Sequence, residues 1–180
     1  MKKTTLFLAL VFATGSLLAQ KKITSSAVIA IDATTPKDDL PKATNNTVIG
    51  SLDTQTGAVA FEAAVKNFTF SNPTMQEHFN GKYWLDSDTY PVISFTGMID
   101  NPGNVHFNKN GVYKVKVEGQ MKIKNISKKE KMDVSITVIN GKIKAASAFQ
   151  LELADYGITA TPIKSGKVAK KPSITVAAEF

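Results

Sequence analysis

The feature that most constrains the fold is a two-residue alternation of apolar and polar side chains between residues 112 and 124. Small or apolar residues occupy one set of positions, namely Tyr113, Val115, Val117, Gly119, Met121 and Ile123. The positions between them hold Lys114, Lys116, Glu118, Gln120, Lys122 and Lys124. Successive side chains of a β-strand point to opposite faces, so this pattern predicts a strand with one buried face and one solvated face.

The same alternation recurs toward the C-terminus. Residues 131–138 repeat it, and the Asn140-Gly141 pair that follows is typical of a two-residue hairpin turn. Residues 143–153 return in phase, and residues 173–180 alternate once more. Antiparallel strands joined by short turns, each buried on one face, predict an all-β barrel or sandwich.

The N-terminal half shows the pattern less regularly. Residues 59–65 alternate, but Phe68 and Phe70 are out of phase with them, which predicts a β-bulge near Asn67. Residues 34–47 are polar and contain two prolines, so we expect a long loop there.

One segment predicts a helix. Asn72 and Pro73 provide a cap and a first-turn proline, residues 74–80 carry apolar side chains at helical spacing, and Gly81 follows as a stop signal. Seven residues make about two turns, which are too short to be stable without packing. We therefore expect this helix to lie as a lid on the β-structure.

The N-terminus has the order of a secretory signal peptide. Lys2 and Lys3 precede an apolar stretch at residues 6–18, and the small residue Ala19 follows. This stretch is shorter than the ~20 apolar residues that a transmembrane helix needs. We expect cleavage of residues 1–19, a single domain over residues 20–180, and a periplasmic or secreted protein. The sequence contains no Cys, which excludes a lipoprotein anchor and disulfides.

The charge pattern argues against nucleic acid as a partner. All 22 basic residues are Lys and the formal net charge is +7, whereas proteins that read nucleic acids rely on the bidentate contacts of Arg. A Lys-rich surface would suit transient contact with anionic membrane lipids, although an ordinary solvated surface explains it more simply. The sequence leaves the oligomeric state open, a homodimer included.

The sequence offers no positive sign of catalysis. Its two histidines, His78 and His106, do not stand at metal-ligand spacing, and no nucleophile or phosphate-binding motif is present. We expect no metal site, no cofactor and no enzymatic activity. The alternative is an enzyme that acts on a lipid with His78 and Asp86 as an acid–base pair, which would require both groups in one cleft.

Aromatic residues concentrate around the predicted helix, between residues 68 and 95. They predict either a packed core under a lid or the mouth of an apolar cavity. A closed sheet of about eight strands is filled by its side chains or, where these are small, holds one ligand. Four small residues are expected on the inner face: Ala63, Gly119, Ala145 and Ser147. They favour an open barrel, and a filled barrel with a structural role is the alternative.

Three motifs resemble the YceI family of lipocalin-like, polyisoprenoid-binding proteins. In residues 78–95 a His-Phe pair, then Trp-Leu-Asp, Tyr-Pro and a final Phe stand at the family's spacing. Residues 119–128 resemble its Gly-x-Leu-Thr-Ile-x-Gly-Val-Thr-Lys motif, and residues 155–158 its Asp-Phe-Gly-Ile motif. The N-terminal strand departs, because residues 22–35 lack the family's Trp and His.

The resemblance implies an eight-stranded antiparallel lipocalin-like barrel with one short helical lid segment. It also implies a long-chain apolar or amphiphilic ligand, such as a polyisoprenoid, an isoprenoid quinone or a fatty-acid-like lipid, held without catalytic residues. We expect the ligand to contact residues of the barrel interior and the lid: Phe61, Phe68, Phe70, Met75, His78, Phe79, Trp84, Tyr90, Phe95, Val117, Met121, Phe149 and Leu151.

Overall fold

The computed structural model describes residues 21–180, so the predicted signal peptide lies outside the described residues. The strands are β1 (Lys21–Asp32), β2 (Lys42–Asp53), β3 (Ala58–Ala64), β4 (Thr69–Phe70), β5 (Val92–Ile99), β6 (Gly111–Ile123), β7 (Ile126–Ile139), β8 (Lys142–Gln150) and β9 (Ser173–Glu179). The helices are α2 (Pro73–Asn80) and α3 (Thr161–Lys164), with short 3-10 turns η1 (Val65–Asn67), η2 (Pro102–Asn104) and η3 (Leu153–Tyr156).

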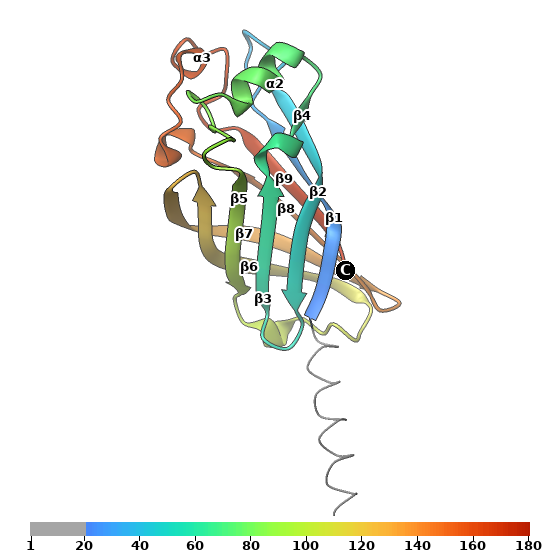
Figure 1. Cartoon of the computed structure of the whole chain (residues 1–180). Helices are drawn as coiled ribbons and strands as arrows, with labels where there is room; N and C mark the ends of the chain where they lie inside the picture. The colour runs from blue at the N-terminus through green and yellow to red at the C-terminus, as the bar shows by residue number, and fades with distance from the viewer. Residues whose placement is uncertain (1–20) are drawn as a thin grey trace, which may run out of the picture.

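The strands form one antiparallel sheet that closes on itself. Its order is β1-β9-β8-β7-β6-β5-β3-β2, and β1 also pairs with β2, which completes an eight-stranded barrel. The two-residue strand β4 adds to β2 beyond the end of β3. The barrel is elongated, with α2 and α3 at the upper end of Figure 1 and the β2–β3 and β7–β8 hairpins at the lower end. The prediction of a lipocalin-like barrel is confirmed.

The two irregular segments of the N-terminal half differ from the predictions. The expected bulge near Asn67 is the 3-10 turn η1, which separates β3 from β4 while both strands pair with β2. The expected loop at residues 34–47 is too long, because β2 begins at Lys42. Asn45 belongs to the polar stretch from which the loop was expected, yet it is fully buried in β2. Its side-chain amide donates a hydrogen bond to the Ala64 carbonyl oxygen (3.0 Å). A tertiary hydrogen bond thus satisfies a polar residue inside the sheet.

The predicted helix and hairpin are present for the expected local reasons. The Asn72 side chain accepts hydrogen bonds from the backbone N–H groups of Thr74 (2.9 Å) and Met75 (3.3 Å), and Gly81 follows the last helical residue of α2. Asn140 and Gly141 both have positive φ (49° and 79°) in the two-residue turn between β7 and β8. The cap lets α2 begin soon after β4, and the turn joins β7 to β8 through two residues, so neither connection requires a long loop.

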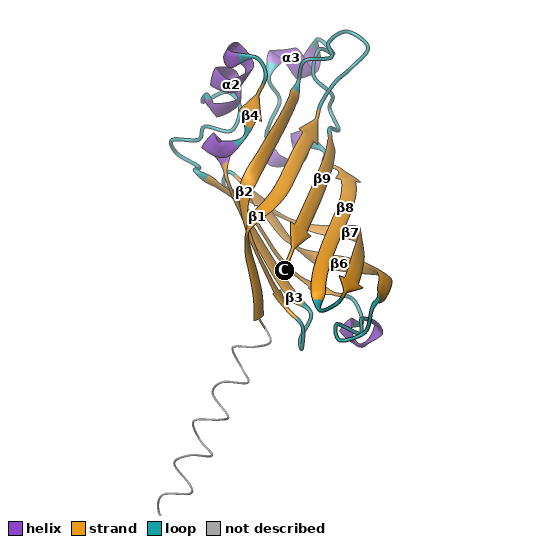
Figure 2. Ribbon diagram, turned by 90° about the vertical axis from the view of Figure 1, so that its right-hand side faces the viewer, coloured by secondary structure: helices purple, strands orange, loops and turns teal. Residues whose placement is uncertain are grey.

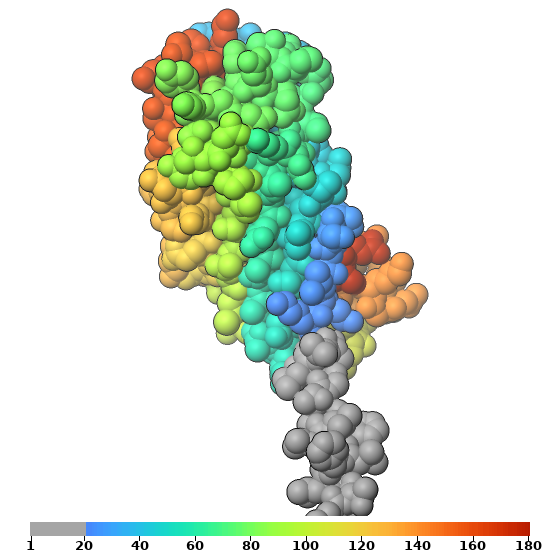
Figure 3. Space-filling view, in the orientation of Figure 1, coloured from blue at the N-terminus to red at the C-terminus, as the bar shows by residue number. Residues whose placement is uncertain are grey.

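The side chains of β6 alternate between the barrel interior and solvent, as the sequence pattern predicted. Val117 and Ile123 are only 3% and 4% exposed, whereas Lys114, Lys116 and Lys122 face solvent. The lower end of the barrel is packed by a buried apolar cluster with these members: Leu52, Phe95, Ile99, Val105, Val117, Ile136, Val138 and Ile143. The upper end is covered by α2 and by the chain around α3, which meet in the space-filling view (Figure 3).

Candidate functional site

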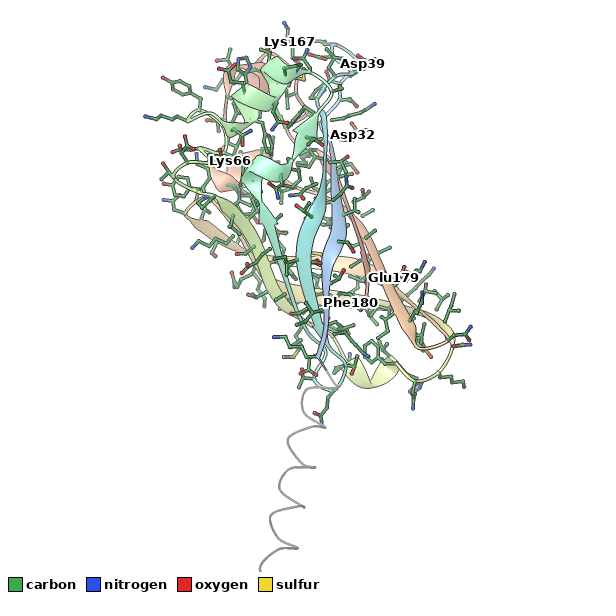
Figure 4. All side chains as sticks on the ribbon, turned by 45° about the vertical axis from the view of Figure 1, so that its right-hand side comes forward. Asp32, Asp39, Lys66, Lys167, Glu179 and Phe180 are labelled. Carbon is green, nitrogen blue, oxygen red and sulfur yellow. The ribbon has the colours of Figure 1, made fainter. Side chains whose placement is uncertain are left out.

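The barrel encloses an apolar cavity of about 140 Å³ in its middle section, called here the lower cavity. All eight barrel strands contribute to its wall, and the polar side chains in the wall are Ser94 and Ser147. Phe180, which lies toward the lower end in Figure 4, packs edge-on against Phe61 with ring centroids 6.4 Å apart. Seven of the predicted ligand contacts line this cavity: Phe61, Phe68, Phe95, Val117, Met121, Phe149 and Leu151.

A second cavity, called here the upper cavity, has a volume of about 210 Å³ and lies between the barrel and the elements at its upper end. Five further predicted contacts line it: Phe70, Met75, His78, Phe79 and Trp84. Three ionisable side chains, Asp38, His78 and Lys167, are part of this wall. Lys167 stands at the upper end of the molecule (Figure 4). The two cavities therefore differ in chemistry, since only the upper one offers charged or titratable groups among the residues described here.

A ring of five aliphatic side chains separates the two cavities. Its members line both of them: Ile31, Ile93, Ile123, Leu151 and Ile174. They come from β1, β5, β6, β9 and the chain that follows β8. The two cavities therefore adjoin at these five residues, which we call the aliphatic ring.

The segment predicted as a lid packs on the upper cavity. The Phe79 ring from α2 lies 5.6 Å from Phe68 and 5.0 Å from Phe70, between ring centroids, so the helix is held to β4 and the barrel wall by aromatic contacts. Trp84 is partly buried against the apolar cluster at this end. Tyr90, the remaining predicted contact, lines neither cavity, and its ring lies beneath the Lys124 ammonium at 5.8 Å.

One small residue expected to leave the barrel open is covered instead. Gly119 pairs with Gly97 of β5, and the Phe95 ring lies over both glycines, so that a Cβ on Gly119 would stand 2.8 Å from that ring. Phe95 therefore fills the space that the glycines leave. Ala63, Ala145 and Ser147, by contrast, line the lower cavity as expected.

Several wall residues were not singled out in the sequence. Ile29 and Ile31 belong to β1, where the residues expected from the family resemblance were missing, and Ile174 and Val176 belong to β9. Their alternation could have marked them as inward-facing, since the apolar run at residues 27–31 and the C-terminal alternation contain them. The α3 region contributes Pro162 and Val168 to the upper cavity, where no periodic signal points to them.

The acid–base pair considered from the sequence is not brought together in the wall of one cavity. His78 lines the upper cavity, whereas Asp86 is absent from the wall of either cavity and sits in a turn with φ 49°. Among residues 21–180, no cluster of three His, Cys, Asp or Glu side chains could hold a metal ion. The pKa of Tyr156 is strongly raised, mainly by burial and also by its hydrogen bond to Glu130 (2.9 Å), but this ring lies outside both cavities.

A family model, the YceI-like domain, matches residues 19–180. The chain belongs to the YceI-like family. The resemblance seen in the three sequence motifs is thereby confirmed, and the YceI-like domain includes the divergent strand β1. No curated protein shows a significant match to the chain.

Solved structures share the fold of this YceI-like domain at low sequence identity. A polyisoprenoid binding domain from Saccharophagus degradans, implicated in plant cell wall breakdown, has a TM-score of 0.75 at 10% identity, covering 89% of this chain and 97% of that one. BcnA from Burkholderia cenocepacia has a TM-score of 0.71 at 15% identity, covering 86% and 96%. A mutant Campylobacter jejuni YceI protein with a monobromobimane guest has 0.54 at 16% identity, covering 88% and 84%.

Within residues 21–180, no helix combines the length and the apolar character needed to cross a membrane.

Proposed function

We propose that this protein binds an amphiphilic lipid, holds its hydrocarbon chain inside the barrel, and carries or sequesters it without changing it chemically. The observation that carries the proposal is the pair of adjoining apolar cavities, with ionisable side chains in the wall of the upper one. A ligand with an apolar chain and a polar head would match this division, its head beside His78 and Lys167 and its chain passing the aliphatic ring.

The volumes suggest that the chain is long. Each water-sized group takes up about 10–15 Å³ of such a cavity, so the cavities of about 140 and 210 Å³ together hold about 23–35 such groups. Each buried CH₂ contributes about 0.8 kcal/mol, and association costs about 4–15 kcal/mol. A chain of about ten carbons in one cavity would barely offset that cost, whereas a chain that occupies both would bind usefully.

The chemical class is proposed from the same geometry and from the fold relatives. The Saccharophagus degradans relative is described as a polyisoprenoid binding domain, which supports a polyisoprenoid or isoprenoid quinone here, with a fatty-acid-like lipid as the other member of the class. We propose that no cofactor or metal takes part. The enzyme alternative is less well supported, because His78 and Asp86 do not face one cavity together, and the open cavities argue against a filled structural barrel.

We propose a periplasmic or secreted location and a mature domain of residues 20–180. Both proposals rest on the order of charged, apolar and small residues in the first nineteen positions. Transient contact with an anionic membrane surface through the exposed lysines would provide a route for lipid exchange. The intact mass of protein recovered from the cell envelope tests the cleavage, and a full-length mass there would contradict it.

The binding proposal is tested by extracting detergent-free protein purified from the cell envelope with organic solvent and identifying the lipids by mass spectrometry. We expect a near-stoichiometric amount of a long-chain amphiphile and renewed uptake of the same lipid from vesicles by the stripped protein. Prolonged incubation should leave the lipid unchanged. Turnover that disappears in His78→Ala would establish the enzyme alternative, and failure to recover or take up any lipid would refute binding.

A further inference from the structure

The lower end of the barrel interior is closed by packed side chains. Val105, Val138 and Ile143 are buried members of the lower apolar cluster and line neither cavity. Val105 belongs to the connection between β5 and β6, which contains η2 and lies at the lower end of the barrel in Figure 2. A ligand chain held in the two cavities therefore has to end above these residues.

Phe95 stands where the lower cavity meets this packed cluster. Its side chain is buried, lines the lower cavity and also belongs to the lower cluster. Within residues 21–180 it is the largest buried side chain of that cluster. β5 runs toward the lower end of the barrel (Figure 1), and Phe95 is the next inward position after Ile93 of the aliphatic ring. The Phe95 side chain thus lies deeper in the barrel than the aliphatic ring.

The Phe95 ring occupies a space that two glycines leave on the inner wall. Gly97 of β5 pairs with Gly119 of β6, and Phe95 pairs with Met121, so Gly119 is the diagonal neighbour of Phe95. A Cβ on either glycine would stand 2.8 Å from the ring. A Cβ on Gly119 would also stand 2.2 Å from the Thr96 carbonyl oxygen, so this position cannot carry a side chain of its own. The space over the glycines is open to a neighbouring side chain or a ligand, and Phe95 fills it.

The volume of the Phe95 ring adjoins the lower cavity, because the ring is part of the cavity wall. Truncation to Ala would remove about six carbon atoms, and the surroundings of a truncated side chain close up only partially. The two glycines have no side chains with which to refill the space. Phe107 differs from Phe95, since it packs against the same cluster but lines neither cavity. Removal of its ring would leave space that borders neither cavity.

We propose that the Phe95 ring sets the upper limit on the length of the hydrocarbon chain that the barrel holds. The inference rests on the proposed function and adds the length class of its ligand. With the ring in place the interior is full after about 23–35 groups, and the remainder of a longer chain stays outside. Affinity therefore rises with chain length up to this limit and then levels off.

The test uses a series of prenyl alcohols of about 15 to about 50 carbons in steps of about five, which brackets the interior capacity. Dissociation constants are measured by displacement of a fluorescent fatty-acid probe. Phe95→Ala removes the ring from the cavity wall, and Phe107→Ala is the matched control because it removes an identical ring from the same cluster. Thermal unfolding checks each variant, and Phe95→Leu replaces Phe95→Ala if that variant does not fold.

For the wild type we expect each added isoprene unit to tighten binding at least about tenfold until the interior is full, and less than about twofold afterwards, since only buried CH₂ groups add affinity. Phe95→Ala should raise this limit by about one isoprene unit, which matches the removed ring in size. Phe107→Ala should lose thermal stability and keep the wild-type limit.

Three results would overturn the inference: an unchanged limit in the Phe95 variant, an equal shift in Phe107→Ala, or a wild-type affinity that still rises at the longest alcohol. Failure of every alcohol to bind the wild type would instead refute the proposed function.

Discussion

Filling the lower cavity from within should abolish lipid binding while leaving the barrel folded. Ala145 lies on β8, pairs with Ile136 and Ala178 on its neighbours, and lines the lower cavity. Ala145→Phe adds about six carbon atoms and displaces a similar number of ligand carbons, each contributing about 0.8 kcal/mol. The expected loss of binding free energy is therefore up to about 5 kcal/mol, which corresponds to an increase in Kd of up to about a few thousandfold.

The assay is displacement of a fluorescent fatty-acid probe, with urea unfolding of the ligand-free variant beside it. Insertion of a larger side chain into a packed core costs about 1–3 kcal/mol, but the open volume at this site should keep the cost at or below the lower end. The matched control is Ala60→Phe on the outer face of β3, which should bind normally. If Ala145→Phe folds with wild-type stability and retains wild-type affinity, the chain does not occupy the lower cavity and our reasoning fails.

Three further predictions concern the stability of the barrel that surrounds the cavities. Val117→Asp should unfold the domain, because an unpaired buried carboxylate costs several kcal/mol against a total free energy of unfolding of about 5–15 kcal/mol. Lys116→Asp, on the solvent face of the same strand, should change the free energy of unfolding in urea by less than about 1 kcal/mol. Equal destabilisation by both substitutions would show that the assignment of inward and outward faces in β6 is wrong. Gly119→Ala would place a Cβ 2.2 Å from a backbone oxygen of β5 and should cost at least about 1–3 kcal/mol, whereas Gly103→Ala points into open space among the described residues and should be neutral by thermal unfolding. Because the pKa of Tyr156 is raised above its ordinary value of 10.0 in the folded protein, its contribution to stability is complete below pH 10 and falls as the pH rises above it; Tyr156→Phe should flatten this alkaline loss in urea melts, and an unchanged slope would contradict the assignment.

The sequence alone determined the elements whose causes are local. The alternation in β6 predicted which side chains are buried, because the two-residue period of a strand depends only on backbone geometry. The cap at Asn72 and the turn at Asn140-Gly141 were predictable for the same reason, since each satisfies the backbone or the φ angle within a few residues. The family resemblance then supplied the closed barrel, and twelve of the thirteen contacts predicted with it line one of the two cavities, the lid residue Phe79 among them.

Only the tertiary structure decided how the barrel interior is shared between side chains and open space. The aliphatic ring joins residues as distant in sequence as Ile31 and Ile174, and the Phe95 ring closes the space over Gly119 that the sequence had suggested was open. The buried Asn45 and the early end of the β7–β8 pairing at Val134 carry no local signal either. A residue's own type and its neighbours in sequence indicate which face it lies on. How much volume remains on that face depends on the side chains that distant strands bring opposite it, because interiors pack by contact between those surfaces.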